Sequence, residues 1–123
     1  MDDKRIWVCG SEQLGEGEYI RIEVSYRGSP SSVVVLKHRE KYFAYQNMCV
    51  HMPRELDCEN NTIFDDKGQL LRCSMHGIVY DPMTGESLST MCNGEKLTSV
   101  RVIEDLEGIW IKDKKVKRID ENN

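Results

Sequence analysis

Two short segments of the chain each place a cysteine close to a histidine. Cys49 and His51 stand two positions apart, Cys73 and His76 stand three apart, and together they use two of the three histidines. Two such loops facing each other can hold two metal ions, one through both sulfurs and the other through both nitrogens. Any one of these residues alone is more often a packed cysteine or a hydrogen-bonded histidine. The pairing therefore predicts a metal site, which requires a fold that brings the two segments together.

The rest of the chain is rich in strand patterns. Residues 19–26 alternate, which is the period of a half-buried strand, and one face carries Ile20, Ile22, Val24 and Tyr26. Further β-rich runs predict strands at residues 33–36, 42–45, 100–103 and 108–111. We expect two hairpins, around residues 38–41 and 104–107, and a turn at 28–30. No segment shows sustained helical periodicity with caps, so the sequence predicts an all-β domain with an irregular middle.

Length and hydropathy limit the class of protein. A chain of 123 residues predicts one domain, residues 1–123. The longest uncharged apolar stretch, near 33–36, is far shorter than the roughly 20 residues of a membrane span, and the first residues lack the pattern of a signal peptide. We therefore expect a soluble, cytoplasmic protein without membrane contact, and a monomer.

Charge is unevenly distributed. The 21 acidic and 17 basic residues give a net charge of −4, which excludes a strongly basic nucleic-acid binder. Residues 54–67 hold five acidic residues against two basic ones, and residues 112–118 are mostly basic. Both runs are typical of solvated surface, although an acidic rim beside the first Cys/His segment can also steer a basic partner. We expect residues 112–123 to be a frayed, basic terminus.

The residues that follow the second Cys/His pair resemble a motif of a known protein family. His76-Gly77 is followed by Tyr80 and then by a turn that ends at Gly85. This text resembles the second cluster-binding loop of Rieske proteins, an HG-x-x-aromatic run followed by a turn and a glycine. With the two Cys/His pairs, the chain resembles a small soluble Rieske-type [2Fe-2S] ferredoxin, specifically over about 42–85. The resemblance implies Rieske-like antiparallel sheets, with a base subdomain and a smaller cluster-binding subdomain at about 42–94.

The resemblance also implies the ligands of a Rieske [2Fe-2S] cluster. By the family pattern, Cys49 and Cys73 bind the inner iron, and His51 and His76 bind the outer one. Histidine ligands make the cluster less negative than four thiolates do, which raises its reduction potential. Tyr80 stands where the family carries an aromatic residue, and its hydroxyl can donate toward a ligand sulfur. Ordinary core packing is an equally good reading of Tyr80.

Some positions differ from the high-potential members of respiratory complexes. Those proteins carry an extra cysteine in each loop and a serine two residues after the second histidine. The corresponding positions here are Arg54, Met75 and Ile78. The chain therefore resembles the ferredoxin branch, at the lower end of the Rieske range of potentials, about −150 mV.

The function implied by this resemblance is one-electron transfer between a reductase and a terminal oxygenase or other redox enzyme. A complete Rieske oxygenase needs a mononuclear iron with two further histidines and a carboxylate, and only His38 remains. The chain is therefore expected not to be an enzyme with its own substrate site. A Rieske-like small subunit of a larger reductase complex, such as a nitrite reductase, is an alternative. A zinc-stabilised interaction module is another, although zinc sites usually pair like ligands within one segment.

Overall fold

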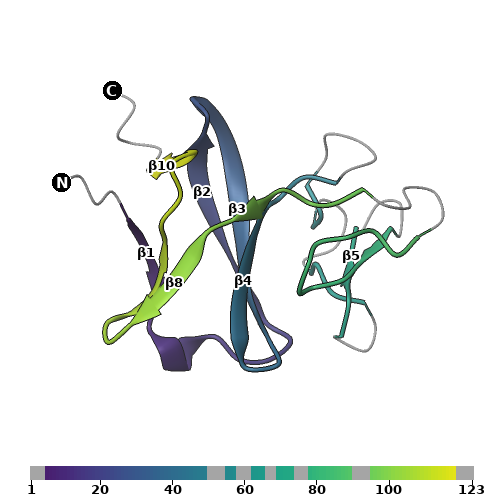
Figure 1. Cartoon of the computed structure of the whole chain (residues 1–123), viewed down its shortest axis with the longest axis horizontal. Helices are drawn as coiled ribbons and strands as arrows, with labels where there is room; N and C mark the ends of the chain where they lie inside the picture. The colour runs from purple at the N-terminus through teal and green to yellow at the C-terminus, as the bar shows by residue number, and fades with distance from the viewer. Residues whose placement is uncertain are drawn as a thin grey trace. The chain divides into compact units, whose positions relative to one another are not determined.

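The computed structural model describes residues 5–49, 55–57, 62–65, 69–73, 78–89 and 95–118. Their elements follow the order β1 (Ile6–Cys9), η1 (Ser11–Gln13), β2 (Tyr19–Tyr26), β3 (Ser29–His38), β4 (Lys41–Gln46), β5 (Leu71–Arg72), β6 (Val79–Tyr80), β7 (Ser99–Val100), β8 (Val102–Asp105), β9 (Gly108–Ile111) and β10 (Val116–Arg118) (Figure 1). Within these ranges one short 3-10 turn is the only helical element, so the predicted all-β class is confirmed. None of their helical residues could form a membrane span.

The chain divides into two compact units. The base unit comprises Met1–Gln46 and Val100–Asn123, and the loop unit comprises Asn47–Ser99. A five-stranded sheet of order β10-β2-β3-β4-β7 and a three-stranded sheet of order β1-β9-β8 contain the strands of the base unit. Strand β3 is central to the larger sheet and pairs antiparallel with β2 and with β4. The loop unit contains the two-stranded sheet β5-β6.

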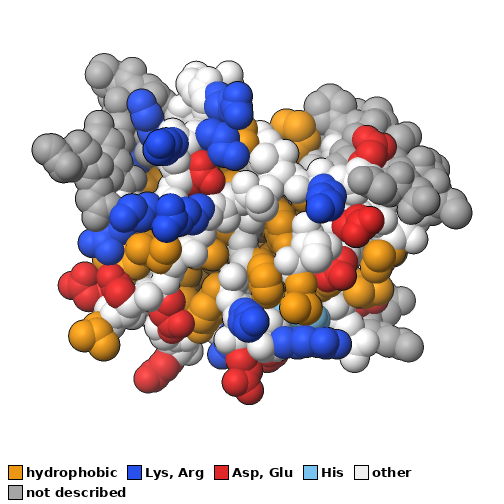
Figure 2. All heavy atoms as spheres, viewed as in Figure 1, with side chains coloured by type: hydrophobic (Ala, Val, Ile, Leu, Met, Phe, Trp, Pro, Cys, Tyr) orange, Lys and Arg blue, Asp and Glu red, His pale blue; other side chains and the backbone are white. Residues whose placement is uncertain are grey.

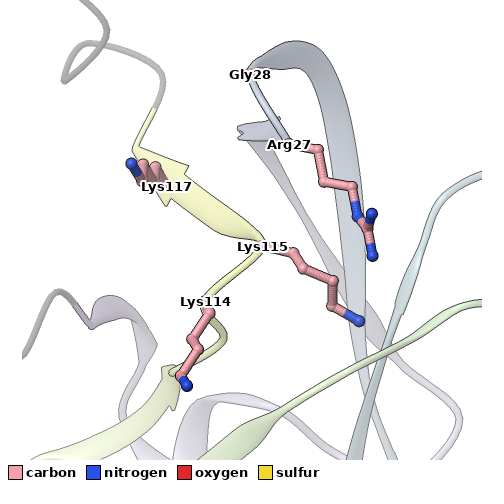
Figure 3. Close-up of a pocket in the computed structure, with 5 residues that line it drawn as sticks. All are labelled: Arg27, Gly28, Lys114, Lys115 and Lys117. Atoms are coloured by element: carbon pink, nitrogen blue, oxygen red, sulfur yellow. The ribbon is translucent and has the colours of Figure 1, made fainter.

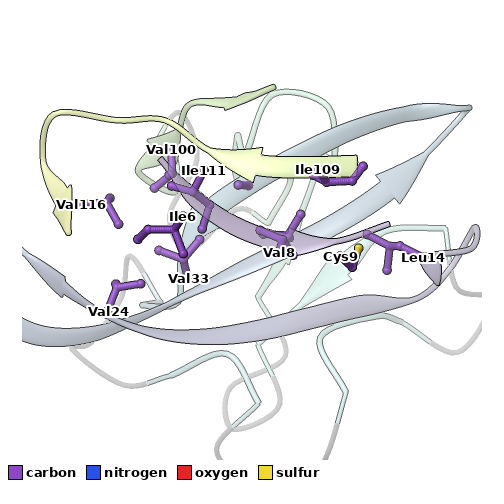
Figure 4. Packing of buried hydrophobic residues seen from close by; sticks show 12 residues of the cluster. Ile6, Val8, Cys9, Leu14, Val24, Val33, Val100, Ile109, Ile111 and Val116 are labelled. Carbon is purple, nitrogen blue, oxygen red and sulfur yellow. The ribbon is translucent and has the colours of Figure 1, made fainter. Parts of the chain in front are cut away.

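Alternating apolar residues from both sheets of the base unit form its core (Figure 4). Strand β3 contributes Val33 and Val35, and β9 contributes Ile109 and Ile111. All four of these side chains are at most 1% exposed. Burial of this kind is the dominant stabilising term in a small β domain, so the base unit has an apolar core of its own.

The first predicted turn, at 28–30, begins one residue earlier and is one residue shorter in the structure. Arg27 and Gly28 form it, with φ of 53° and 88°, whereas Ser29 and Pro30 already belong to β3. A two-residue turn with positive φ at both positions matches the twist of a hairpin. Pro30 is tolerated in the strand because β4 pairs with β3 only from Val33 onward, which leaves Pro30 beyond that ladder.

The strand predicted at 100–103 is divided between the two sheets. Val100 ends β7 in the five-stranded sheet, whereas Val102 begins β8 in the three-stranded one. The hairpin between β8 and β9 is confirmed, with a tighter turn than expected because Asp105 pairs with Gly108. Gly108 has a φ of 131°, and a Cβ there would overlap the carbonyl oxygen of Cys9, so this position requires glycine.

The basic segment near the C-terminus is ordered rather than frayed over residues 112–118. Val116–Arg118 forms β10, which pairs antiparallel with β2 from Val24 to Tyr26. Val116 is only 2% exposed and joins the core of the base unit, which explains why this segment is held in place. Residues 119–123 of the predicted tail lie outside the described residues.

Candidate metal centre

The first predicted ligand segment begins directly after β4. The strand ends at Gln46, and Cys49 follows three residues later with an exposed fraction of 3%. His51, the other predicted ligand of this segment, lies outside the described residues. The structure therefore places one of the two residues of the first pair, as a buried cysteine.

Asn47 links the two ends of this segment, a role that no sequence pattern indicates. Its side chain is 2% exposed, its Oδ1 accepts the backbone N–H of Leu56 at 2.8 Å, and its Nδ2 donates to Oδ1 of Asp57 at 3.1 Å. A buried amide with both ends bonded is strongly directional. Asn47 therefore fixes where the chain leaves β4 relative to where it returns at Leu56, on either side of Cys49.

The second predicted segment lies in the β5-β6 hairpin. Leu71 pairs with Tyr80, Arg72 pairs with Val79, and the N–H of Cys73 donates to the carbonyl oxygen of Ile78 at 2.9 Å. Cys73 therefore stands at the base of the hairpin loop. The predicted ligand His76 lies between Cys73 and Ile78 in the sequence, outside the described residues.

One face of this hairpin is buried and the other is not. Leu71, Cys73, Ile78 and Tyr80 are each at most 2% exposed, whereas Arg72 is exposed. Because successive strand residues point to opposite faces, the alternation puts Cys73 and Tyr80 on the same buried face. The residues around the second pair therefore place the thiol of Cys73 and the phenol of Tyr80 on one face of the hairpin.

Tyr80 contacts the cysteine of the first segment. Its hydroxyl oxygen lies 3.2 Å from Sγ of Cys49, and both residues are buried. Either atom can donate while the sulfur is protonated, but a metal-bound cysteine is a thiolate, and then the hydroxyl donates. Tyr80 therefore packs in the interior and also reaches a predicted ligand sulfur. Core packing and hydrogen bonding to that sulfur, the two roles that the sequence left open for Tyr80, are compatible.

A turn after β6 supports the hairpin. Asp81 begins it, with Oδ1 accepting the N–H of Met83 at 2.8 Å, and the N–H of Gly85 donates to the carbonyl of Asp81 at 2.7 Å. Gly85 has a φ of 76°, and its own carbonyl accepts the N–H of Leu97 at 2.8 Å. The turn ending in glycine that the sequence predicts is therefore present, and it fastens a later segment of the loop unit to the hairpin.

The described part of the site fits the cysteine half of the predicted ligand set. Cys49 and Cys73 are both buried at the starts of their segments, and a hydroxyl donor lies beside one of them. Within the described ranges no group of three or more potential metal ligands occurs, and both predicted histidines fall outside those ranges. Cys9 differs from the pair, because it packs in the core of the base unit, where burial raises the pKa of its thiol.

Comparison with known proteins identifies the family. The family model of the Rieske [2Fe-2S] domain matches residues 4–105. The chain therefore belongs to the Rieske [2Fe-2S] domain family, and its cofactor is a Rieske-type [2Fe-2S] cluster. No curated protein sequence matches the chain.

Solved structures show the same fold. The ferredoxin of carbazole 1,9a-dioxygenase from Nocardioides aromaticivorans IC177 has a TM-score of 0.69 and 22% identity, over 90% of this chain and 99% of its own. A chain in a complex of reduced oxygenase and oxidized ferredoxin in carbazole 1,9a-dioxygenase has a TM-score of 0.71 and 19% identity, over 93% and 97%. In another reduced oxygenase and ferredoxin complex, the match has a TM-score of 0.69 and 19% identity, and covers 89% of this chain but 28% of that one.

Proposed function

We propose that this chain is a one-electron carrier that takes an electron from a reductase and delivers it to a terminal oxygenase or a related redox enzyme. Family membership supports the cofactor, and the neighbours described as a ferredoxin, or as part of an oxygenase and ferredoxin complex, share its fold. The observation that carries the proposal is the buried contact between Cys49 and Tyr80. It joins the two segments that a cluster-binding clamp must bring together.

In this proposal four side chains hold the cluster. Cys49 and Cys73 bind one iron, and His51 and His76 bind the other. The cluster supplies reversible uptake of a single electron. The protein supplies two thiolates that are shielded from water, since both cysteines are at most 3% exposed. Such burial limits solvent access and lowers the local dielectric, and both affect the potential of a metal site.

Tyr80 acts on the potential through Cys49. Its hydroxyl donates to the thiolate, and this bond strengthens when the site gains negative charge, so it favours the reduced state. The same hydroxyl keeps Cys49 in a fixed position relative to the β5-β6 hairpin. Tyr80 is therefore a positioning residue as well as a tuning residue.

A permanent subunit or domain of a larger redox enzyme is the second candidate. It is favoured by one observation, that this fold covers 28% of a longer chain in an oxygenase and ferredoxin complex. A carrier must dissociate between donor and acceptor, whereas a subunit stays bound. The two functions therefore differ in turnover rather than in the cofactor.

The decisive experiment combines loading with turnover. The purified protein is titrated anaerobically with dithionite while visible absorption and iron are measured, and we expect one electron and two irons per chain. A colourless protein that contains zinc would contradict the proposal. The reduced protein is then supplied in substoichiometric amounts between a flavin-dependent reductase and a Rieske oxygenase.

Repeated turnover per chain is the result expected of a carrier. A chain that takes up one electron, yet leaves cells only in a complex with a larger subunit and cannot cycle, would favour the second candidate. The iron and electron counts thus test the cofactor, and the turnover assay separately tests the carrier function.

A further inference from the structure

A cleft in the base unit is lined almost entirely by cations. It lies between the β2-β3 turn and the segment that leads into β10, with a volume of about 360 Å³ (Figure 3). Its lining residues are Arg27, Gly28, Lys114, Lys115 and Lys117. Four of the five are positively charged, and none is acidic. This feature belongs to the base unit and is separate from the residues proposed to hold the cluster.

Backbone hydrogen bonds hold the two walls of the cleft together. The N–H of Arg27 donates to the carbonyl oxygen of Lys115 at 2.8 Å, and β10 pairs with β2. Asp113 is the acid nearest in sequence, and its two oxygens accept the N–H groups of Arg101 and Lys115, each at 2.9 Å. This carboxylate therefore fixes the turn before β10. The backbone that carries these cations is therefore hydrogen-bonded to neighbouring segments of the base unit.

Three of the four cations are open to an external partner, whereas Lys115 is half-buried, with its Nζ 6.0 Å from the centroid of the Tyr26 ring. Arg27, Lys114 and Lys117 are exposed, and within the described residues none of the four cations is in an ion pair. The side chains of Arg27 and Lys115 extend from adjoining backbone toward the same side (Figure 3). Figure 2 shows Lys and Arg side chains gathered at this end of the base unit. Like charges held close together repel, and an anion in the cleft relieves that repulsion.

We propose that this cleft is the docking site for a carboxylate-rich segment of a protein partner. Long, exposed lysines spread around an open cleft can meet several carboxylates along an extended acidic segment. A site for a single phosphate usually aims backbone N–H groups at the anion, but the N–H of Arg27 is already bonded to Lys115. The proposal concerns the base unit and does not depend on the electron-carrier function.

The test measures binding of a fluorescein-labelled oligoglutamate peptide to the cluster-loaded chain of 123 residues by fluorescence anisotropy. The site variant is Lys114→Gln/Lys115→Gln/Lys117→Gln, which removes three positive charges and leaves polar, slightly shorter side chains. We expect its affinity for the peptide to fall about tenfold, since each exposed charge pair contributes only modestly. Binding to the wild type should also weaken steeply as salt shortens the Debye length below about 10 Å.

The matched control is Lys37→Gln/Lys41→Gln/Lys96→Gln, which removes the same charge from elsewhere. Lys37 and Lys41 stand near the β3-β4 turn, at the opposite end of β3 from Arg27. We expect this control to lose less than about twofold. An equal loss in both variants would mean attraction to overall charge and would overturn the proposal.

A second experiment replaces the peptide with inorganic phosphate and measures phosphate binding by calorimetry. Phosphate that binds to the wild type as tightly as the peptide, and is lost in the site variant, would overturn the proposal in favour of a phosphate site. If the circular dichroism spectrum of a variant matches that of the wild type, the variant is folded, and its loss of affinity is not caused by unfolding.

Discussion

In the base unit, β2 and β3 pair over eight consecutive positions, from Tyr19 with Leu36 to Tyr26 with Ser29. In the loop unit, β5 and β6 pair over two, and single bonds such as those of Asn47 link segments that also bury apolar side chains such as Leu56 and Ile63. A long ladder over an apolar core tolerates the loss of one contact. A segment held by single bonds does not, so we expect the loop unit to depend on its cluster for order while the base unit does not.

The largest effect should come from removing a predicted ligand. His76→Ala should abolish the normal cluster, because it removes a terminal iron ligand. Iron analysis and the visible spectrum measure the loss, and hydrogen exchange should show faster exchange in the loop unit with little change in the base unit. The control is His38→Ala at the end of β3, which should keep iron and colour. Full iron and an unchanged spectrum in His76→Ala would refute the assignment.

A substitution in the core of the base unit should have the opposite effect, a loss of stability with the cluster retained. Ile109→Ala empties a fully buried position in the base unit and should lower the free energy of unfolding by about 2–5 kcal/mol, as measured by urea denaturation. The neighbouring control Leu106→Ala, at a fully exposed position of the same hairpin, should change it by less than about 0.5 kcal/mol. The visible spectrum of folded Ile109→Ala should be that of the wild type. A bleached spectrum would show that the cluster depends on the base core.

Asn47 tests whether single bonds really hold the first segment. Asn47→Ala leaves the buried N–H of Leu56 without its side-chain partner, at a cost of about 1–3 kcal/mol, and should speed the loss of iron to a chelator. Gln46→Ala is the adjacent control, because the Gln46 amide donates to Ser31 in the base unit at 3.2 Å. Equal rates of iron loss in the two variants would remove the special role of Asn47.

Tyr80→Phe should lower the reduction potential by tens of millivolts, because it removes the donor to Cys49 and keeps the ring. Protein-film voltammetry measures the shift. Tyr42→Phe is the control, since the Tyr42 hydroxyl donates to the carbonyl of Ser11 in the base unit at 3.0 Å. A wild-type potential in Tyr80→Phe, with the cluster intact, would reduce Tyr80 to a packing residue.

The smallest predicted effect concerns an exposed carboxylate of the base unit. The pKa of Asp105 is held below its ordinary value of 3.8, first by the Trp110 indole and then by the N–H of Glu107. Because the pKa of Asp105 is lower in the folded state, its carboxylate stabilises the fold at pH values above 3.8. This stabilisation is lost as the pH falls through the folded-state pKa. Asp105→Asn should therefore be slightly less stable than the wild type at pH 7, with the difference vanishing in strong acid. A difference that grows on acidification would contradict this sign.

The sequence predicted those strands whose pattern is local. Residues 19–26 alternate strictly, and β2 has those bounds. The short strands β1 and β10 were not foreseen, because four apolar residues or a lysine-rich segment give no period by themselves. Their order comes from pairing with distant strands, β1 with β9 and β10 with β2.

The sequence predicts site residues only where their chemistry shows in closely spaced residues. The Cys/His pairs and Tyr80 stand at recognisable spacing, whereas Asn47 carries no such signal. A polar residue after a strand is usually exposed, and only the folded chain brings it to Leu56 and Asp57. Such a role depends on contacts between segments, which one sequence does not reveal.

The central claim is that two histidines and two cysteines hold the cluster. It is tested most directly by pulsed electron paramagnetic resonance of the reduced protein, grown with 15N-labelled histidine. We predict hyperfine coupling to nitrogen from two histidines, unchanged in His38→Ala. A spectrum without histidine nitrogen coupling would show that the iron has other ligands and would contradict the assignment of His51 and His76.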